Sequence, residues 1–271
     1  MEPTQTKNPI TLPIAIVIAG VLIAGAIFLR SGTGGSPEID KGVGEKTPAL
    51  SLDDIPLSPI DEARDHIRGN PGADIIFVEF SDTECPFCKR FHTTMQRVMS
   101  VYGKSGQVAW VYRQFPIVGL HPKAPKESEA LLCAGELGGN AMFWEYADRI
   151  FEITPSNNGL DLAELPRIAG RIGLDAARFD ECLSSGRHAE RVQSELKDGS
   201  AAGATGTPYS VLVLKRPVSE EDRDALLALM EPFRDPYGEL PIRLSKDGLR
   251  IGLSGALPFD ALKATIDILL K

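Results

Sequence analysis

The hydrophobic and polar residues near position 80 follow the pattern of a strand–helix–strand unit. Residues 74–80 form an apolar run rich in β-branched side chains, which is typical of a buried strand. From residue 86 the apolar positions recur at helical spacing until about Gly103, and residues 107–115 alternate like a second strand. We therefore expect two strands joined by a helix, with a right-handed crossover.

The middle of the chain, residues 121–203, carries helical patterns almost throughout. Glycine-, serine- and proline-rich turns divide it into segments of helical length. The expected helices cover residues 125–137, 141–153, 162–172, 175–183 and 188–203.

The last part of the chain returns to a strand pattern and closes with an amphipathic helix. Apolar runs predict strands at 209–214 and 250–255, and residues 259–270 predict the final helix. The stretch 217–247 is longer than a tight hairpin requires. We expect it to be a surface elaboration, with partner docking as the alternative. We expect it to contain an extra helix at 220–233 and a short strand at 241–245.

The N-terminal part predicts a membrane anchor followed by a tether. No charged residue stands between Ile10 and Leu29. A helix of about twenty residues rises about 30 Å, enough to cross the hydrocarbon core of a bilayer. A cleavable signal peptide usually has a shorter apolar region, and a buried core helix usually has a polar face, but both alternatives stay open. We expect a cytoplasmic stub and anchor at 1–30, a tether at 31–60 and the folded domain at 61–271.

Composition and charge narrow the class of protein. Asp and Glu outnumber Lys and Arg by 37 to 29, which gives a net charge of −8. An acidic chain with no basic stripe argues against nucleic acid as a main partner. Four cysteines in 271 residues are too few for a small domain held together by disulfides.

Two of these cysteines form a C-x-x-C motif at the predicted strand-to-helix junction. Cys85 would begin the helix, and Pro86 occupies a favourable first helical position. The free N–H groups at a helix N-terminus stabilise a thiolate and lower the pKa of the outer cysteine. Cys88 then lies one helical turn away, where it can resolve a mixed disulfide. A structural zinc site and two inert buried thiols are the alternatives.

With the later Gly-Thr-Pro at 206–208, residues 78–88 resemble the DsbA-like branch of the thioredoxin superfamily, and most closely its membrane-tethered bacterial members. The resemblance implies an α/β thioredoxin fold (βαβ…ββα) interrupted by an all-helical domain, here at about 121–203. It also implies dithiol–disulfide exchange, with Cys85 as the attacking cysteine and Cys88 as its resolving partner. Pro208 matches the family's cis-proline, and the backbone of Thr207 would pair with the substrate strand.

Two residues around the motif carry expectations of their own. Glu79 matches the family's buried acid, whose raised pKa would let it take the proton from Cys88. An exposed edge position is the alternative for Glu79. Phe87 stands where the well-known oxidases of the family have a histidine, and it offers the thiolate neither charge nor hydrogen bond. His92, one turn after Cys88, is expected on the solvated surface, with tuning of the thiolate as the alternative.

The remaining cysteines, Cys133 and Cys182, both fall in the helical segment. In an oxidising compartment we expect them to form a structural disulfide. Closing a loop of about 50 residues would stabilise the fold by about 4 kcal/mol on the chain-entropy model.

These observations predict a membrane-tethered thiol:disulfide oxidoreductase that forms disulfides in secreted or membrane proteins. The catalytic domain would face the periplasm or cell surface from a single-pass anchor. No organic cofactor or metal is expected, and the family implies reoxidation by a quinone-linked membrane partner of the DsbB-like or VKOR-like kind. A disulfide isomerase or reductase that uses the same cysteines is the alternative, followed by a module that binds client chains without catalysis.

Overall fold

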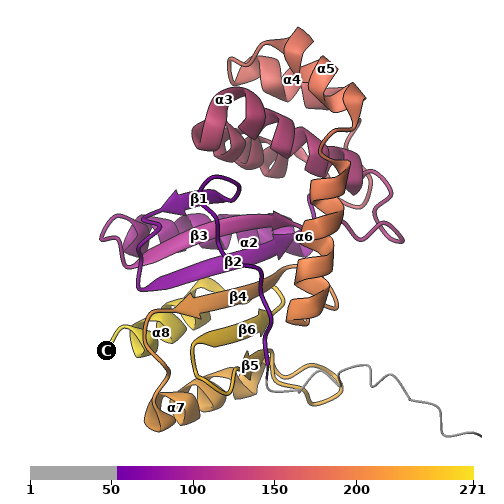
Figure 1. Cartoon of the computed structure of the whole chain (residues 1–271). Coiled ribbons are helices and arrows are strands. Elements are labelled where there is room, and N and C mark those ends of the chain that lie inside the picture. The colour runs from indigo at the N-terminus through magenta and orange to yellow at the C-terminus, as the bar shows by residue number, and fades with distance from the viewer. Residues whose placement is uncertain (1–53) are drawn as a thin grey trace, which may run out of the picture. The chain divides into compact units, whose positions relative to one another are not determined.

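A mixed six-stranded sheet forms the centre of the folded unit Leu50–Lys271. The computed structural model describes residues 54–271 of the chain. The strand order is β1-β3-β2-β4-β6-β5, and within it only β2 and β3 run parallel. Figure 1 shows the twisted sheet with helices on both sides. The strands are β1 (His66–Gly69), β2 (Ile75–Ser81), β3 (Val108–Gln114), β4 (Tyr209–Leu214), β5 (Ile242–Leu244) and β6 (Arg250–Ser254).

The predicted strand–helix–strand unit is present. Helix α2 (Pro86–Val98) follows β2, continues as the short π-helix η1 (Met99–Gly103), and leads into β3. Parallel pairing of β2 with β3 requires such a crossover connection.

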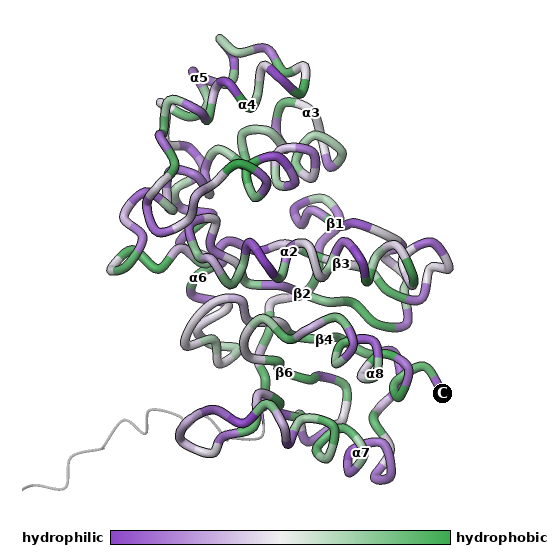
Figure 2. Tube along the Cα trace, turned by 180° about the vertical axis from the view of Figure 1, so that it is seen from behind, coloured by the Kyte–Doolittle hydropathy of each residue, from purple (hydrophilic) through white to green (hydrophobic). Residues whose placement is uncertain are grey.

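Alternation along β2 assigns its side chains to two core layers. Ile75 and Phe77 belong to the layer under α2 and the C-terminal helix α8 (Phe259–Leu269). Val78 and Phe80 belong to the opposite layer, which includes residues of helix α6 (Ala189–Ala202). Because side chains alternate with a period of two, Glu79 points to the same face as Phe77, toward α2. Figure 2 shows hydrophobic stretches along the inner strands β2, β4 and β6.

The predicted helical insertion lies between β3 and β4. It contains α3 (Ala124–Ile153), α4 (Glu164–Arg171) and α5 (Ala176–Ser185), and α6 returns the chain to the sheet (Figure 1). The expected break at Gly138 and Gly139 is only a kink. Gly139 leaves helical geometry, with φ 72° and ψ −169°, while the helix resumes on both sides of it. One glycine in the left-handed region bends the path without requiring a loop.

The stretch 217–247 adds an edge to the domain. Helix α7 (Glu220–Met230) is followed by the single 3-10 turn η2 (Glu231–Phe233) and by β5. Ser219 caps α7 by accepting a hydrogen bond from the Asp222 amide. Leu226 and Met230 are fully buried and join the core beneath α8. The extra segment is therefore packed into the fold.

Two observations change the expected organisation at the N-terminal side. Strand β1 was not predicted, because its four residues are largely charged or polar and it pairs only at the sheet edge, with β3. Ile55, expected within the tether at 31–60, is fully buried in the α6 layer, so the folded unit begins before residue 61. The expected anchor at 10–29 and most of the tether lie outside the described residues. Across residues 54–271, no helix combines the length and the apolar character that a membrane crossing requires.

Candidate active site

Cys85 is the residue that caps the N-terminus of α2. Its backbone is extended, with φ −78° and ψ 121°, and Pro86 follows at the first helical position. The turn before it is held by Asp82, whose carbonyl accepts from the Cys85 amide at 3.1 Å and whose carboxylate accepts from the Glu84 amide at 2.8 Å. The chain thus leaves β2 through a tight polar turn and places the Cys85 sulfur at the positive end of the helix.

The two thiols of the motif have opposite electrostatic surroundings. A hydrogen bond from Cys88 is the largest influence that lowers the pKa of Cys85 to about 6; contacts with Thr207 and the helix amides add to it, while partial burial opposes it. Complete burial is the main reason that the pKa of Cys88 lies well above its ordinary value. The Cys88 sulfur accepts from the Asp82 amide at 3.5 Å. Near neutral pH the pair therefore consists of one thiolate and one thiol.

Opposite Cys85 lies the cis peptide between Thr207 and Pro208. The Cys85 sulfur is 3.4 Å from the Thr207 carbonyl oxygen. The buried Thr207 hydroxyl has no hydrogen-bond partner among residues 54–271, so it is available to donate to the Cys85 thiolate. The sequence-predicted Cys85, Thr207 and Pro208 are thus brought together from opposite ends of the domain. A shallow cavity of about 160 Å³, lined by residues 205–209 with Ser254 and Gly255, adjoins them.

Glu79 is completely buried on β2, beneath α2. Its Oε2 accepts a hydrogen bond from the indole N–H of Trp110 at 2.8 Å, and its Oε1 has no partner in the described part of the chain. Burial raises the pKa of Glu79 to about 7, against the opposing influence of the nearby Ser81 hydroxyl and of the hydrogen bond from Trp110. Its charge also contributes to raising the pKa of Cys88. An acid of this pKa can hold or release a proton at neutral pH.

His92 is buried, and the expectation of a solvated surface residue is wrong. Its Nε2 lies 2.7 Å from an Asp148 carboxylate oxygen, and its ring stacks on Phe151 with centroids 4.6 Å apart. Both partners come from α3, which covers this side of α2. A cavity of about 410 Å³ lies beside His92 between the two helices. Burial lowers the pKa of His92, although the Asp148 carboxylate opposes the shift, so the imidazole is mainly neutral at neutral pH.

A buried carboxyl group that the sequence analysis missed lies near the same turn. Glu127, at the start of α3, accepts from the Thr83 hydroxyl at 2.6 Å. Burial, reinforced by a contact with Glu84, raises the pKa of Glu127 to about 8. Glu84 in turn accepts from the Gly159 and Leu160 amides. The acidic residues just before the C-x-x-C motif were the available signal, but a polar turn of this kind is usually solvated.

Phe87 is the exposed member of the motif. Just over half of its side-chain surface, 53%, is accessible, and the Arg90 guanidinium lies 5.1 Å from its ring centroid. Phe87 is thus an apolar surface next to Cys85, and its ring supplies no hydrogen bond to the thiol.

Cys133 and Cys182 form a disulfide that joins α3 to α5 across 49 residues of sequence. Both are almost inaccessible to solvent. The structure thus forms the pair that the sequence indicates, away from Cys85 and Cys88, which are both reduced.

Comparison with known proteins places this arrangement in a family. A family model described as Thioredoxin matches residues 61–230, more than half of the chain. The fold is similar to that of Pseudomonas aeruginosa DsbA2, with 24% identity, a TM-score of 0.52, and coverage of 75% of this chain and 93% of that one. It is also similar to BdbD from Bacillus subtilis (15% identity, TM-score 0.59, 80% and 100% coverage). Wolbachia pipientis alpha-DsbA1 has 18% identity and a TM-score of 0.57, with 79% and 93% coverage.

Part of the sequence is also similar to curated proteins that are named as Na(+)/H(+) antiporters. The chain is 31% identical over 183 residues to a protein named Na(+)/H(+) antiporter NhaA 1 from Mycolicibacterium gilvum. The aligned residues make up 66% of this chain and 28% of that protein. A protein named NhaA from Herminiimonas arsenicoxydans is 31% identical over 191 residues, or 70% of this chain and 29% of that protein. The chain spans less than a third of these relatives. The family model over residues 61–230 shows that the chain belongs to the thioredoxin family, and the solved DsbA and BdbD structures share its fold.

Proposed function

We propose that this chain forms disulfides in secreted or membrane proteins outside the cytoplasm, by donating a Cys85–Cys88 disulfide to them. The observation that carries the proposal is that the pKa values of the two thiols shift in opposite directions. The pKa of Cys85 is lowered to about 6, and the pKa of Cys88 is strongly raised. A cysteine whose thiolate is stabilised is a good leaving group, and a stabilised reduced form makes the disulfide oxidising.

The reaction consists of two exchanges at sulfur. A substrate thiolate attacks Cys85 Sγ in the oxidised enzyme; the Cys85–Cys88 bond breaks, a substrate–Cys85 disulfide forms, and Cys88 leaves as a thiolate that takes up a proton. A second substrate thiolate then attacks the substrate sulfur of that mixed disulfide and releases Cys85 as a thiolate. The substrate gains one disulfide and loses two electrons, and the enzyme gains the two electrons as a dithiol.

Glu79 is positioned to manage the proton of Cys88. The leaving thiolate of Cys88 is buried, where an uncompensated charge is costly. Glu79 lies near enough for its charge to influence the pKa of Cys88, and its own pKa of about 7 allows it to exchange a proton at neutral pH. We assign it the role of proton donor in the first exchange and proton acceptor when the pair is reoxidised.

The surface around Cys85 suits an extended polypeptide. The cavity beside Pro208 and the exposed Phe87 ring flank the sulfur. Backbone groups near Thr207 would pair with a substrate strand, as the family resemblance implies.

The location and the partners rest on the sequence. Residues 10–29 would anchor the chain in the membrane, with the folded domain outside the cytoplasm. Reoxidation of the Cys85–Cys88 dithiol requires a two-electron acceptor, for which we propose a quinone-linked membrane partner. The exchange takes place between sulfur atoms, with Glu79 handling the proton, and needs no metal or organic cofactor.

A second function, disulfide isomerase or reductase, is favoured by one specific observation. Phe87 gives the Cys85 thiolate no charge or hydrogen bond, and a pKa of about 6 is only moderately lowered. A less stabilised thiolate means a less oxidising pair.

Three assays on the full chain separate these functions. Net oxidation of a reduced substrate protein supports the oxidase, unscrambling of a wrongly paired substrate without net oxidation supports the isomerase, and binding without exchange would leave only a client-binding module. Cys85→Ala is the control for each assay. Equilibration of the Cys85–Cys88 pair with glutathione gives its reduction potential, and a value near that of cytosolic thioredoxin, about −270 mV, would overturn the oxidase assignment.

A further inference from the structure

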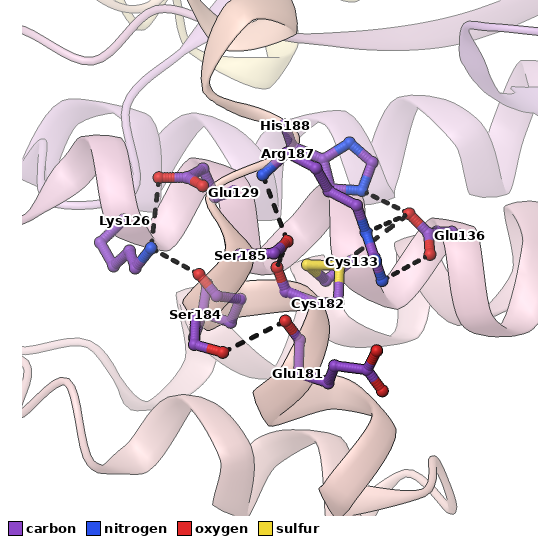
Figure 3. Close-up of a disulfide and its surroundings, with 11 residues drawn as sticks. Lys126, Glu129, Cys133, Glu136, Glu181, Cys182, Ser184, Ser185, Arg187 and His188 are labelled. Carbon is purple, nitrogen blue, oxygen red and sulfur yellow. Dashed lines mark hydrogen bonds and ion pairs between the residues drawn. A yellow bond between two sulfur atoms is a disulfide. The ribbon is translucent and has the colours of Figure 1, made fainter.

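The Cys133–Cys182 disulfide lies within a group of side chains that resembles a set of metal ligands. The two sulfur atoms and a ring nitrogen of His188 all lie within 4.8 Å of one another. In the described residues 54–271, no other group of three cysteine, histidine or carboxylate ligands has comparable spacing. Figure 3 shows Glu136 of α3 and His188, the residue just before α6, in contact with each other beside the disulfide.

Glu136 supplies a fourth donor atom to this group. Its Oε2 lies 2.9 Å from His188 Nε2 and 3.9 Å from Cys182 Sγ. Cys133 and Glu136 are three residues apart on α3, so they share one face of the helix. Cys182 and His188 stand on either side of the turn between α5 and α6, which Gly186 closes in the left-handed conformation with φ 65°.

We propose that reduction of this disulfide creates a binding site for a thiophilic divalent cation, with Zn²⁺ as the best fit. In a tetrahedral zinc site, metal–sulfur distances of about 2.3 Å and metal–nitrogen distances of about 2.0 Å place the donor atoms about 3.3–3.8 Å apart. The two sulfurs would each have to move by about 1 Å to reach that separation from a covalent bond. The ligands are four side chains: Cys133, Cys182, His188 and Glu136.

The chemistry balances with an external dithiol as the reductant. The dithiol gives two electrons and two protons, the Cys133–Cys182 bond breaks into two thiols, and the reductant becomes a disulfide. Zn²⁺ then displaces the two thiol protons as it binds both sulfurs. In the reverse direction, a disulfide oxidant closes the bond and releases the cation.

The charges around the group suit a cation bound by two thiolates. Two thiolates and the Glu136 carboxylate would leave one negative charge beside a divalent cation. Arg187 compensates that charge, since its guanidinium contacts Glu136 Oε1 at 2.8 Å and Oε2 at 3.1 Å. The same contacts orient the carboxylate, as an outer-shell partner does for a metal ligand.

Solvent reaches the group from the Glu136 side. The sulfurs are buried, but the side chains of Glu136 and His188 remain 39% and 17% exposed. This provides an entry path for the ion. A bound cation would join α3 to the α5–α6 turn in the reduced chain, as the disulfide joins α3 to α5 in the oxidised one.

Cobalt binding by the full chain tests the proposal. Cys85→Ser and Cys88→Ser are introduced together so that the other thiols bind no metal, and the chain is reduced with a phosphine. We expect one Co²⁺ per chain, with a thiolate-to-cobalt charge-transfer band and tetrahedral ligand-field bands that disappear on addition of Zn²⁺. The oxidised chain should show neither band. Because the proposed active site is absent from this variant, the result does not depend on the proposed function.

Ligand variants distinguish this site from nonspecific thiol binding. His188→Ala and Glu136→Ala should each weaken Co²⁺ binding at least tenfold, whereas Glu129→Ala, which removes a nearby carboxylate of α3, should not. Circular dichroism follows the fold of the reduced chain, and Zn²⁺ should raise its unfolding midpoint without changing that of the oxidised chain. Absence of Co²⁺ bands, bands unaffected by His188→Ala, or an unfolding midpoint of the reduced chain that Zn²⁺ does not raise would overturn the proposal.

Discussion

Cys85 stands at the first turn of α2, whereas Cys133 lies inside α3, about two turns from its start. The hydrogen bond from Cys88 does most to lower the pKa of Cys85 to about 6, and the backbone N–H groups at the helix start, which lack helical partners, add to it. Within α3 the same groups are used by the helix. The comparison indicates that position along a helix distinguishes the thiol proposed for exchange from the one that forms the disulfide, since both sulfurs are buried.

The residues around the Cys85–Cys88 pair also differ from those around the Cys133–Cys182 pair. The Cys85 pair has a buried acid, Glu79, beneath it and the Thr207–Pro208 backbone in front of it. The Cys133 pair has a partly exposed acid, Glu136, which is already matched by Arg187. The first set of neighbours suits the proposed proton transfer and polypeptide binding, whereas the acid of the second set is paired with an arginine.

The largest contrast between the pairs is expected in exchange activity. Cys85→Ser removes the attacking sulfur and should lower the rate of disulfide transfer by roughly a thousandfold or more. The matched double variant Cys133→Ser with Cys182→Ser should retain transfer. A stopped-flow assay with a reduced peptide measures both rates. Equal losses in the two variants would remove the distinction between the pairs.

Stability should show the opposite contrast. Replacing Cys133 and Cys182 together with alanine opens a loop of 49 residues and should lower the free energy of unfolding by about 4 kcal/mol. Urea denaturation of the oxidised proteins measures this change. Replacing Cys85 and Cys88 together with alanine opens a much shorter loop and should cost less. A larger loss from the second change would contradict the structural role assigned to the first pair.

Glu79, the buried acid beside the Cys85 pair, should make the free energy of unfolding depend on pH, and the Cys133 pair has no such neighbour among residues 54–271. With a pKa raised from 4.5 to about 7, folded Glu79 retains a proton that the unfolded chain has released, so its contribution makes stability fall between these pH values. The effect of Glu79→Gln on the free energy of unfolding should therefore be more favourable at pH 8 than at pH 4, by on the order of 1–3 kcal/mol. Urea titrations at both pH values measure it, with Glu136→Gln as the control. The same change in both variants would show that burial of Glu79 has no special effect.

The thiolate itself can be followed by alkylation. The rate of iodoacetamide reaction at Cys85 should titrate with a midpoint of about 6, as the thiolate forms. Cys88→Ala removes the hydrogen bond that does most to lower the pKa of Cys85. The midpoint should therefore rise by about one pH unit, which corresponds to about 1.4 kcal/mol. Cys88→Ser restores a donor and should recover part of the shift. A midpoint near 9 in the unmodified chain would contradict the assignment of Cys85 as the thiolate.

Substitution of Phe87 should have the smallest effect of these changes, a small shift in the reduction potential of the Cys85–Cys88 pair. Phe87→His places a group able to carry charge beside Cys85, and a shift of one pKa unit corresponds to about 30 mV in the reduction potential. We expect a rise of at most about this size, measured against glutathione. Phe87→Leu keeps the site apolar and should leave the potential unchanged. An equal rise in the leucine variant would attribute the effect to packing.

Features encoded locally were predictable from the sequence. Periodicity located β2, α2 and β3, and the C-x-x-C motif with the later Gly-Thr-Pro identified the residues that meet around Cys85. The resemblance to the DsbA-like family implied that Glu79 is a buried acid, and the structure buries it completely. The strands and the helix follow from neighbours in sequence, whereas the meeting of Cys85 with Thr207, 122 residues away, was implied by the family resemblance.

Features that depend on distant contacts were not predictable. His92 follows a surface-like run of Lys89 and Arg90, yet Asp148, 56 residues away, covers it. Glu127 is buried because it meets Thr83 across 44 residues. Neither burial has a local signal, since a polar residue on a helix is usually solvated and only the packing of α3 on the sheet changes that.

Helix α3 makes contact with both ends of the thiol-bearing segment. Glu127 meets the turn before Cys85, and Asp148 meets His92 on the helix that follows. The disulfide at Cys133 is attached to this helix between those two contacts. Because close-packed interiors transmit displacement, a shift of α3 would reach that segment at both contacts. The disulfide holds α3 in place, so we expect its loss to alter the geometry around Cys85 slightly while disulfide transfer is retained.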